Sequence, residues 1–393
     1  MPRLVNTCVL AAIVIFLLIT FTAFLRSPNA PAPHPGDDSL EGAFDQIPAK
    51  NQPPVSIVYD PPVEELASTK QQPKKQDSPK NKELKNEVPK KEEQKQPQKP
   101  KLAFPQQQKT FDVPAGIVYD KAGPKPEQVV LLAASDGKGH NGGIPNLLEY
   151  AKENREEYAR LHGYHFNFID ITRYDLNGAH PVWAKLPAIV DSFNDFPEAQ
   201  WVWWLDLDAI IMSPQIDLNS HILSYSAMHS RFEKNAPIIG GGGHKTNLFT
   251  PKEYDVSQID IIISQDHNGL NAGSFFIRRS AFSKWLMDLW SDPQFINSKW
   301  EGKEQDALLN LVINHKSVRD HVGYVNQRVI NAYPVGGSNM GWYTGDLVVH
   351  FAGCWVEHKC AAQFEDFWNR RKTAEQVRKE SKVTENLRRR RRR

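Results

Sequence analysis

Cysteine is scarce in this chain, and no Asn-x-Ser/Thr acceptor site for N-linked glycans occurs in it. Three cysteines among 393 residues are too few for a small domain held together by disulfide bonds. All ten tryptophans occur at Trp183 or later, whereas 18 of the 28 prolines lie between Pro28 and Pro126. The average composition therefore conceals two unlike parts, of which only the second has the side chains for a large core.

A strong net charge is also lacking, since the formal charge at pH 7 is +2. The last six residues, 388–393, are all arginine, so the rest of the chain sums to −4. A nucleic-acid-binding protein needs a basic surface spread over a folded face, and we exclude that class and predict no nucleic-acid partner. For the basic C-terminal tail, residues 373–393, we expect a solvated segment, and contact with anionic glycans or membrane headgroups is the alternative.

One long uncharged run occurs, over residues 4–25, between Arg3 and Arg26. As a helix it would span ~33 Å, enough to cross the hydrocarbon core of a bilayer. A cleaved signal peptide is the alternative, but its apolar region usually has ~7–15 residues and ends at a small-residue cleavage site. We predict an uncleaved transmembrane signal anchor with residues 1–3 in the cytoplasm, although Arg26 weakens the charge asymmetry that sets orientation.

Residues 26–127 are rich in Pro, Lys, Glu and Gln. Too few apolar side chains are present to offset the entropy of ordering, which predicts a disordered stem. A basic recognition segment is the alternative, but Lys and Glu alternate and nearly cancel in charge. We therefore expect a stalk that holds a folded domain away from a membrane.

The folded part is predicted over residues 128–372, long enough for one α/β domain. Buried or alternating apolar runs predict strands at 129–135, 164–171 and 201–205. Helical periodicity occurs at 144–162 and 183–196. Strands that alternate with helices of this length predict a mostly parallel sheet with helices on both faces.

Two acidic residues follow directly after the third predicted strand. The apolar run Trp201–Leu205 leads into Asp206-Leu207-Asp208, and side chains two positions apart on a strand share a face. Paired carboxylates repel each other unless a cation lies between them, and a hard divalent metal accepts such oxygen ligands. Two solvated loop carboxylates are the alternative. Because the flanks are apolar and ligands bind beyond the carboxyl ends of such strands, we predict a metal site that holds a diphosphate.

Three other segments carry candidate residues. The segment 266–274 is polar, contains glycine and leads into a strand from Phe275; it is either a ligand-binding loop or an ordinary turn. Residues 303–309 begin an apolar helix, whose acidic residues either bind a ligand or only favour the helix N-terminus. His350 ends a β-like run and is either structural or a further metal ligand.

Four consecutive glycines occur at 240–243, before His244 and Lys245. No Lys-Ser/Thr pair follows at the spacing of a phosphate-binding loop. We therefore expect a flexible loop rather than a phosphate site.

Six segments, in this order along the chain, resemble glycosyltransferase family 34, which includes fungal Golgi α-1,2-galactosyltransferases and α-1,6-mannosyltransferases and plant xyloglucan xylosyltransferases. The segments are Ala159–Gly163, Trp183–Pro187, Trp203–Ala209, Gln265–Asp266 with Asn271–Phe275, Glu304–Ala307 and His350–Cys354. The resemblance implies a GT-A fold, a Rossmann-like domain that binds a nucleotide sugar, Mn²⁺ as cofactor, and transfer with retention of the anomeric configuration.

The resemblance also implies roles for individual residues. It implies that Asp206 and Asp208 bind the metal and diphosphate, and that His350 is the third metal ligand. It places Gln305 near the anomeric carbon and Glu304 against sugar hydroxyls. The other implied roles are a sugar-binding turn for Asn271 and Gly273, nucleotide binding for Ser135 and Asp136, and a further donor contact for Lys185.

One position departs from the plant enzymes, which carry a lysine after the Gly-Cys pair where this chain has Trp355. The cation that neutralises phosphate there is missing, and Lys359 or Arg328 are candidates to replace it. The nearby Cys354 and Cys360 would favour pairing in an oxidising lumen. A zinc site with His358 is the alternative, but the spacing is unusual for zinc, and we expect a disulfide.

These observations predict a metal-dependent retaining hexosyltransferase in the Golgi membrane, single-pass and type II, with a luminal catalytic domain. The donor is UDP-galactose or GDP-mannose, and the acceptor is a mannose-terminated glycan. One alternative is a non-catalytic or partner-dependent subunit of a mannan-polymerising complex, in which other Golgi transferases would be its partners. The other alternative is a membrane-tethered nucleotide-sugar hydrolase. A non-catalytic subunit would be free to lose Asp206, Asp208, Gln305 or His350, and all four are present.

Overall fold

A computed structural model describes residues 110–138 and 143–391 of the chain. Its central sheet has six strands in the order β2-β1-β3-β8-β7-β9. The strands are β1 Val129–Ser135, β2 His165–Asp170, β3 Trp201–Leu205, β7 Ile261–Asp266, β8 Gly269–Arg278 and β9 Val322–Val325. Only β8 runs antiparallel to its neighbours. The predicted α/β class is confirmed, and the sheet, predicted to be mostly parallel, is mixed through the single antiparallel strand β8.

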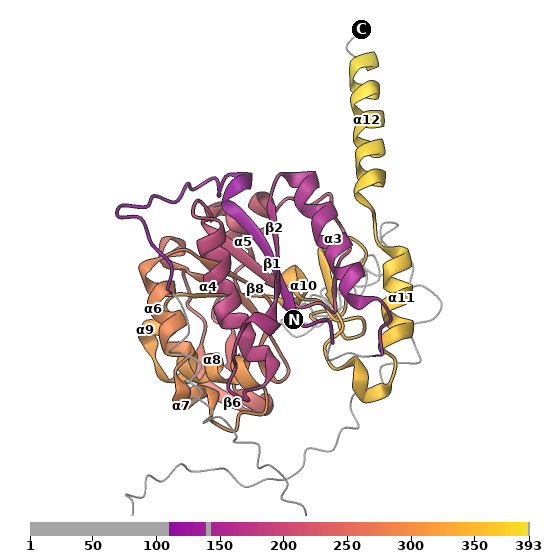
Figure 1. Ribbon diagram of the computed structural model, residues 1–393. Coiled ribbons are helices and arrows are strands. Elements are labelled where there is room, and N and C mark those ends of the chain that lie inside the picture. The colour runs from indigo at the N-terminus through magenta and orange to yellow at the C-terminus, as the bar shows by residue number, and fades with distance from the viewer. Residues whose placement is uncertain (1–109, 139–142, 392–393) are drawn as a thin grey trace, which may run out of the picture. The chain divides into compact units, whose positions relative to one another are not determined.

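Helices cover both faces of this sheet (Figure 1). Helices α4, α6 and α8 pack on one face, and α3, α5 and α10 pack on the other. The helices are α3 Leu147–His162, α4 Lys185–Asp195, α5 Tyr225–Arg231, α6 Ala281–Trp290, α7 Pro293–Ile296, α8 Lys303–Asn314, α9 Lys316–Arg319, α10 Gln327–Ile330, α11 Cys360–Arg370 and α12 Ala374–Arg391.

The aromatic strand β3 belongs to two cores at once. Trp201 and Trp203 lie in the core on one face, and Val202 and Trp204 lie in the core on the other. This division follows from the alternation of side chains along a strand. An apolar run without polar interruptions is therefore what a strand in the middle of a covered sheet requires.

A third cluster lies beside the sheet. The short strands β4 Ala209–Ile211 and β10 Val348–His350 pair antiparallel, and they pack with α11. Cys354 and Cys360 form a disulfide at the start of this helix, which confirms the predicted pairing. A further small hairpin joins β5 Pro237–Ile239 to β6 Lys245–Phe249.

The polar segment 266–274 is mostly strand, so the prediction of a loop there was wrong. The true turn is His267-Asn268, between β7 and β8. The β7–β8 register shifts so that Ile263 pairs with Phe275 and Ser264 with Asn271, which leaves three β8 residues bulged away from β7. The composition of these bulged residues is typical of a turn. They stay in the sheet because Ser274 pairs with Leu205 of β3 on the other side of β8.

The folded part begins before the predicted boundary at residue 128. Phe111 is buried against Phe193, with ring centroids 4.6 Å apart, and Arg279 donates to the Asp112 carbonyl. Residues 110–127 thus belong to the fold, because the Phe111 ring and the Asp112 carbonyl both bind residues of the folded part. The rest of the predicted stem, and the predicted anchor at 4–25, lie outside the described residues. Within 110–138 and 143–391, no helix combines the length and the apolar content that crossing a bilayer requires.

Candidate active site

The acidic turn, Asp206 to Asp208, lies between the end of β3 and the start of β4. The Asp206 N–H donates to the Gly273 carbonyl at 2.7 Å, and the Ala209 N–H donates to the Asp206 carbonyl at 3.1 Å. The turn is therefore joined to β8 at one end and closed on itself at the other. Its carboxylates lie at the carboxyl edge of the parallel strands, where the sequence predicted them.

A fully buried arginine on α3 supports the acidic turn from behind. Arg155 donates to the Asp206 carbonyl at 2.5 Å and to the Ala209 carbonyl at 3.1 Å. Burial lowers the pKa of Arg155 to about 10, while the two aspartates raise it, so the guanidinium is charged at neutral pH. Sequence analysis missed this residue because it lies on the buried face of an amphipathic helix. Its neighbour Asn154 binds both backbone groups of Ile211.

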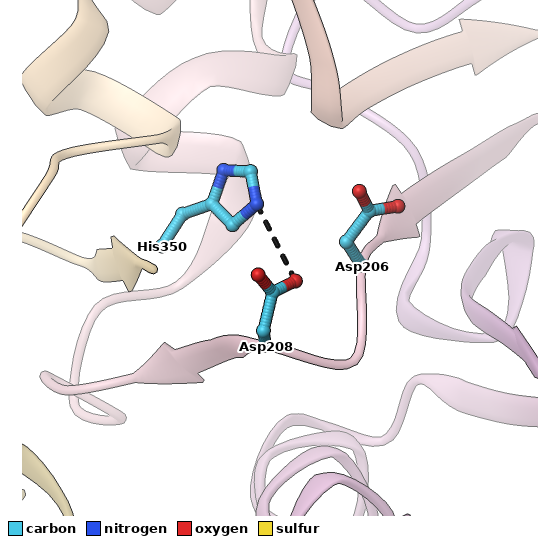
Figure 2. Close-up of side chains that lie close together, drawn as sticks. All are labelled: Asp206, Asp208 and His350. Atoms are coloured by element: carbon cyan, nitrogen blue, oxygen red, sulfur yellow. Dashed lines mark ion pairs between the residues drawn. The ribbon is translucent and has the colours of Figure 1, made fainter. Parts of the chain in front are cut away.

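The three predicted metal ligands come together. Asp206, Asp208 and His350 each offer one ligand atom, and these atoms lie within 4.8 Å of one another. Figure 2 shows the side chains converging from the ends of β3 and β10 and the start of β4. His350 Nε2 lies 3.5 Å from Asp208 Oδ1. Two carboxylates and an imidazole are a donor set that divalent metals of the first transition row accept.

The electrostatics of these three side chains favour a cation. Burial lowers the pKa of His350, but the charge and hydrogen bond of Asp208, with the charge of Asp206, raise this pKa above its ordinary 6.5. The imidazole therefore tends to take up a proton when nothing else neutralises the carboxylates. A divalent metal would supply positive charge in place of that proton and displace it.

The His350 imidazole packs directly against the β8 backbone. A Cβ atom built on Gly273 would lie 2.1 Å from His350 Cε1 and 2.8 Å from each ring nitrogen. No side chain fits in that space, so glycine is required there. Gly273, predicted to bind the donor, is thus also the surface on which the third metal ligand rests.

Asn271, predicted to contact sugar, is the centre of a buried polar network. Its Oδ1 accepts from the Gly273 N–H at 3.0 Å and from Asn331 Nδ2 at 2.9 Å. Its Nδ2 donates to Asp266 at 3.0 Å and to the Tyr333 hydroxyl at 2.8 Å, and that hydroxyl donates to Asp266. Every donor and acceptor position of the amide is therefore engaged within the protein.

Lys185 and Glu304 form a buried ion pair next to the acidic turn. Lys185 Nζ lies 2.8 Å from Glu304 Oε1, 2.7 Å from the Ala272 carbonyl and 3.5 Å from Asp206 Oδ1. Burial lowers the pKa of Lys185, but Asp206 and Glu304 raise it above its ordinary value. Burial raises the pKa of Glu304, and Lys185 opposes that rise. The lysine, predicted to touch the donor, directs its ammonium group at three protein acceptors.

Gln305 lies beside Glu304 in the first turn of α8. Its Oε1 accepts from the Ala272 N–H at 3.2 Å, so the bulged part of β8 binds Lys185 through its carbonyl and Gln305 through its N–H. The structure thus brings the predicted α8 residues to the same side of β8 as the acidic turn.

The predicted nucleotide-binding residues lie at the end of β1, where Ser135 is the last residue of the strand and Asp136 follows it. Leu132 pairs with Trp204, so β1 ends at the edge of the sheet that carries the acidic turn. Ser135 Oγ accepts from the Gly137 N–H, and Asp136 accepts from the Lys138 N–H. These bonds hold the segment in a tight turn.

One candidate for the missing phosphate-binding cation has a different partner. Arg328 binds both carboxylate oxygens of Asp346, at 2.8 and 2.9 Å, and its guanidinium lies 4.3 Å from the Tyr343 ring centre. This bidentate pairing occupies the Nε and Nη2 edge of the guanidinium, whose N–H groups would otherwise bind a phosphate.

The formal charges of the site add up to a small negative value. Asp206, Asp208 and Glu304 carry three negative charges, against the two positive charges of Lys185 and Arg155. This residual charge is concentrated at the acidic turn, where it favours a divalent cation.

Comparisons with known proteins identify the family of this chain. The profile of the galactosyl transferase GMA12/MNN10 family matches residues 125–361. The chain is similar to the probable alpha-1,2-galactosyltransferase gmh1 of Schizosaccharomyces pombe, with 42% identity over 61% of this chain and 72% of the relative. It is also similar to the probable alpha-1,6-mannosyltransferase MNN10 of Saccharomyces cerevisiae, with 35% identity over 61% of this chain and 65% of the relative.

Among solved structures, a glycosyltransferase involved in the glycosylation of the major capsid of PBCV-1 aligns with 61% of this chain and 98% of its own, at 15% identity and a TM-score of 0.40. The family assignment rests on the sequence matches, which span the whole site from Ser135 to His350. The chain therefore belongs to the galactosyl transferase GMA12/MNN10 family, which is glycosyltransferase family 34, and it is a hexosyltransferase.

Proposed function

We propose that this protein is a metal-dependent, retaining transferase of the GT-A type that moves a hexose from a nucleotide sugar to a mannose-containing glycan. The observation that carries the proposal is the convergence of Asp206, Asp208 and His350 beside the buried pair of Lys185 and Glu304. Mn²⁺ is the proposed metal. These ligands would hold it, and it would supply positive charge that stabilises the leaving diphosphate.

The residues of the chain account for the rest of the reaction. Lys185 holds Glu304 with a 2.8 Å ion pair, which lowers the nucleophilicity of that carboxylate. Gln305 is a poor nucleophile and would stabilise positive charge on the sugar ring as the bond to the diphosphate breaks. The acceptor hydroxyl would then attack from the face that the diphosphate leaves and pass its proton to the departing diphosphate, which retains the anomeric configuration. A trapped covalent sugar adduct on Glu304 would overturn this route.

The proposal also names the sugar that is transferred. The identity of 42% with a probable alpha-1,2-galactosyltransferase exceeds the 35% with a probable alpha-1,6-mannosyltransferase, which favours UDP-galactose as the donor. GDP-mannose is the second candidate, because both kinds of relative match across the same site.

We further propose that the protein is a type II protein of the Golgi membrane, anchored by residues 4–25, with its catalytic domain in the lumen. The disulfide between Cys354 and Cys360 supports a compartment more oxidising than the cytosol. The proposed location is tested by protease protection of intact Golgi vesicles, in which the epitope of a C-terminal tag should resist digestion until detergent is added.

The activity is tested with the full-length protein, each of the two donors, a mannobiose acceptor and Mn²⁺ or a chelator. Transfer of galactose that requires Mn²⁺ is expected, and Asp208→Asn should lower it by about two orders of magnitude or more. The matched control is Asp288→Asn, at an exposed carboxylate on α6, which should leave transfer unchanged. Donor hydrolysis without transfer would favour the hydrolase, no reaction with either donor would favour the non-catalytic subunit, and full activity of Asp208→Asn would refute the metal assignment.

A further inference from the structure

Asn331, which the sequence analysis did not select, lies next to the third proposed metal ligand. It is fully buried and lies between α10 and β10. Its Oδ1 is 2.8 Å from His350 Nδ1. The adjacent Ala332 accepts the His350 backbone N–H at 2.7 Å, so backbone and side chain of this segment both bind the histidine.

The hydrogen-bond network fixes which atom of each amide is which. The Gly273 backbone N–H can only donate, so the Asn271 atom that it meets at 3.0 Å must be the oxygen. That oxygen can only accept, so the Asn331 atom 2.9 Å from it must be the amide nitrogen. The Asn331 oxygen then faces His350, and because a carbonyl oxygen only accepts, Nδ1 of His350 must carry a hydrogen.

The consequence lies on the other ring nitrogen. A neutral imidazole has one hydrogen, so with Nδ1 protonated the Nε2 lone pair is free on the side of Asp208. Asp208 alone, 3.5 Å away, would favour a hydrogen on Nε2, which would block coordination of a metal. The orientation of the Asn331 amide therefore decides between a ligand and a non-ligand form of the histidine.

We propose that Asn331 is a positioning residue that keeps neutral His350 in the Nδ1–H form and so presents Nε2 as a metal ligand. The role of the metal rests on the proposed function, but the form of the imidazole does not. Hydrogen-bond partners of metal-binding histidines typically contribute 10–100-fold to metal affinity.

Two variants of Asn331 distinguish the loss of its hydrogen-bond acceptor from a change in side-chain volume. Asn331→Leu removes the acceptor at nearly constant volume, and Asn331→Asp keeps an acceptor opposite Nδ1. Ser264→Ala is the matched control, because Ser264 Oγ meets the other end of the Asn331 amide at 3.3 Å and does not touch the histidine in the network described above. Asn331→Leu should weaken Mn²⁺ binding 10–100-fold, whereas Ser264→Ala should change it less than about threefold.

The first readout is ¹⁵N NMR of the metal-free, full-length protein labelled in histidine, at alkaline pH where His350 is neutral. The His350 signals are identified as those missing from His350→Gln. The wild type and Asn331→Asp should show a protonated Nδ1, and Asn331→Leu should move the hydrogen wholly or partly to Nε2. A protonated Nε2 in the wild type would overturn the inference, and this result is readable even if Asn331→Leu does not fold.

The second readout is Mn²⁺ affinity, measured by the electron paramagnetic resonance of free Mn²⁺. An Asn331→Leu protein with unchanged imidazole signals and unchanged affinity would also overturn the inference. A wild-type protein that binds no Mn²⁺ would instead refute the proposed function, while the NMR result would still decide the role of Asn331.

Discussion

Replacing Gly273 by alanine adds one methyl group at the point where His350 rests on β8. The new Cβ would lie 2.1 Å from His350 Cε1, and ordinary contacts begin near 3.4 Å. The imidazole must therefore move by about 1.3 Å. Metal–ligand distances tolerate about 0.2 Å, so the displaced ring cannot coordinate together with Asp206 and Asp208.

The cost to stability follows from the same geometry. An overfilled core position typically costs 1–3 kcal/mol. A flexible side chain would escape by rotating, but His350 is bound at Nδ1 by Asn331 and approached at Nε2 by Asp208. We therefore expect a loss of about 1–3 kcal/mol in the free energy of unfolding, and a loss of Mn²⁺ affinity of at least the 10–100-fold typical of disturbed ligand supports.

The assay is urea unfolding combined with Mn²⁺ titration, for Gly273→Ala alone and together with His350→Ala. If the collision is the cause, the alanine should cost much less once the imidazole is gone, which a double-mutant cycle measures. Gly337→Ala is the control, because a Cβ atom there meets nothing within 4 Å. An equal loss of stability with and without the imidazole would refute the steric explanation.

Three further predictions concern charge and cross-linking. The pKa of His350 in the folded protein lies above its ordinary value of 6.5, so protonated His350 stabilises the protein without Mn²⁺. This contribution is complete below pH 6.5 and is lost as pH rises through the folded pKa. The free energy of unfolding should therefore fall over that pH range relative to His350→Gln, and parallel curves for the two proteins would contradict this. Lys185→Met leaves Glu304 buried without its cation and should cost about 3–5 kcal/mol; adding Glu304→Leu should recover much of it, and a further loss would argue against the ion pair as the cause. Replacing Cys354 and Cys360 by serine should lower the free energy of unfolding by about 2 kcal/mol, because the disulfide closes a short loop and restricts the unfolded chain. Urea unfolding measures this difference, and an unchanged free energy of unfolding would exclude the contribution.

The parts of the fold that the sequence predicted are those with an uninterrupted signal. The strands β1 and β3 have the predicted bounds because both are buried on two faces and are followed directly by an aspartate, Asp136 and Asp206. The helix predicted from residue 144 begins at Leu147 instead, because Asn146 adopts a left-handed conformation, with φ of 56°. Strand direction left no local signal, and the antiparallel course of β8 follows from its hairpin with β7.

The candidate site divides in the same way. The acidic pair follows a strand that sequence patterns reveal, and His350 ends a visible β-like run. Arg155 and Asn331 were not found because a buried cation on an apolar helix face, and an amide in an irregular segment, have no periodic signal. Their roles depend on partners far along the chain, such as the Asp206 carbonyl, which lies 51 positions from Arg155.

The pairing of β3 with β8 has a consequence for synthesis on the ribosome. Trp201 pairs with Arg278 and Leu205 with Ser274, so one edge of the apolar strand stays without its partner until some 70 further residues have been added. At roughly 5–20 residues per second, this interval lasts about 4–15 s. During that time a tryptophan-rich edge is open to pairing with other chains. We expect the nascent protein to depend on chaperones from the completion of Leu205 until β8 has emerged and docked.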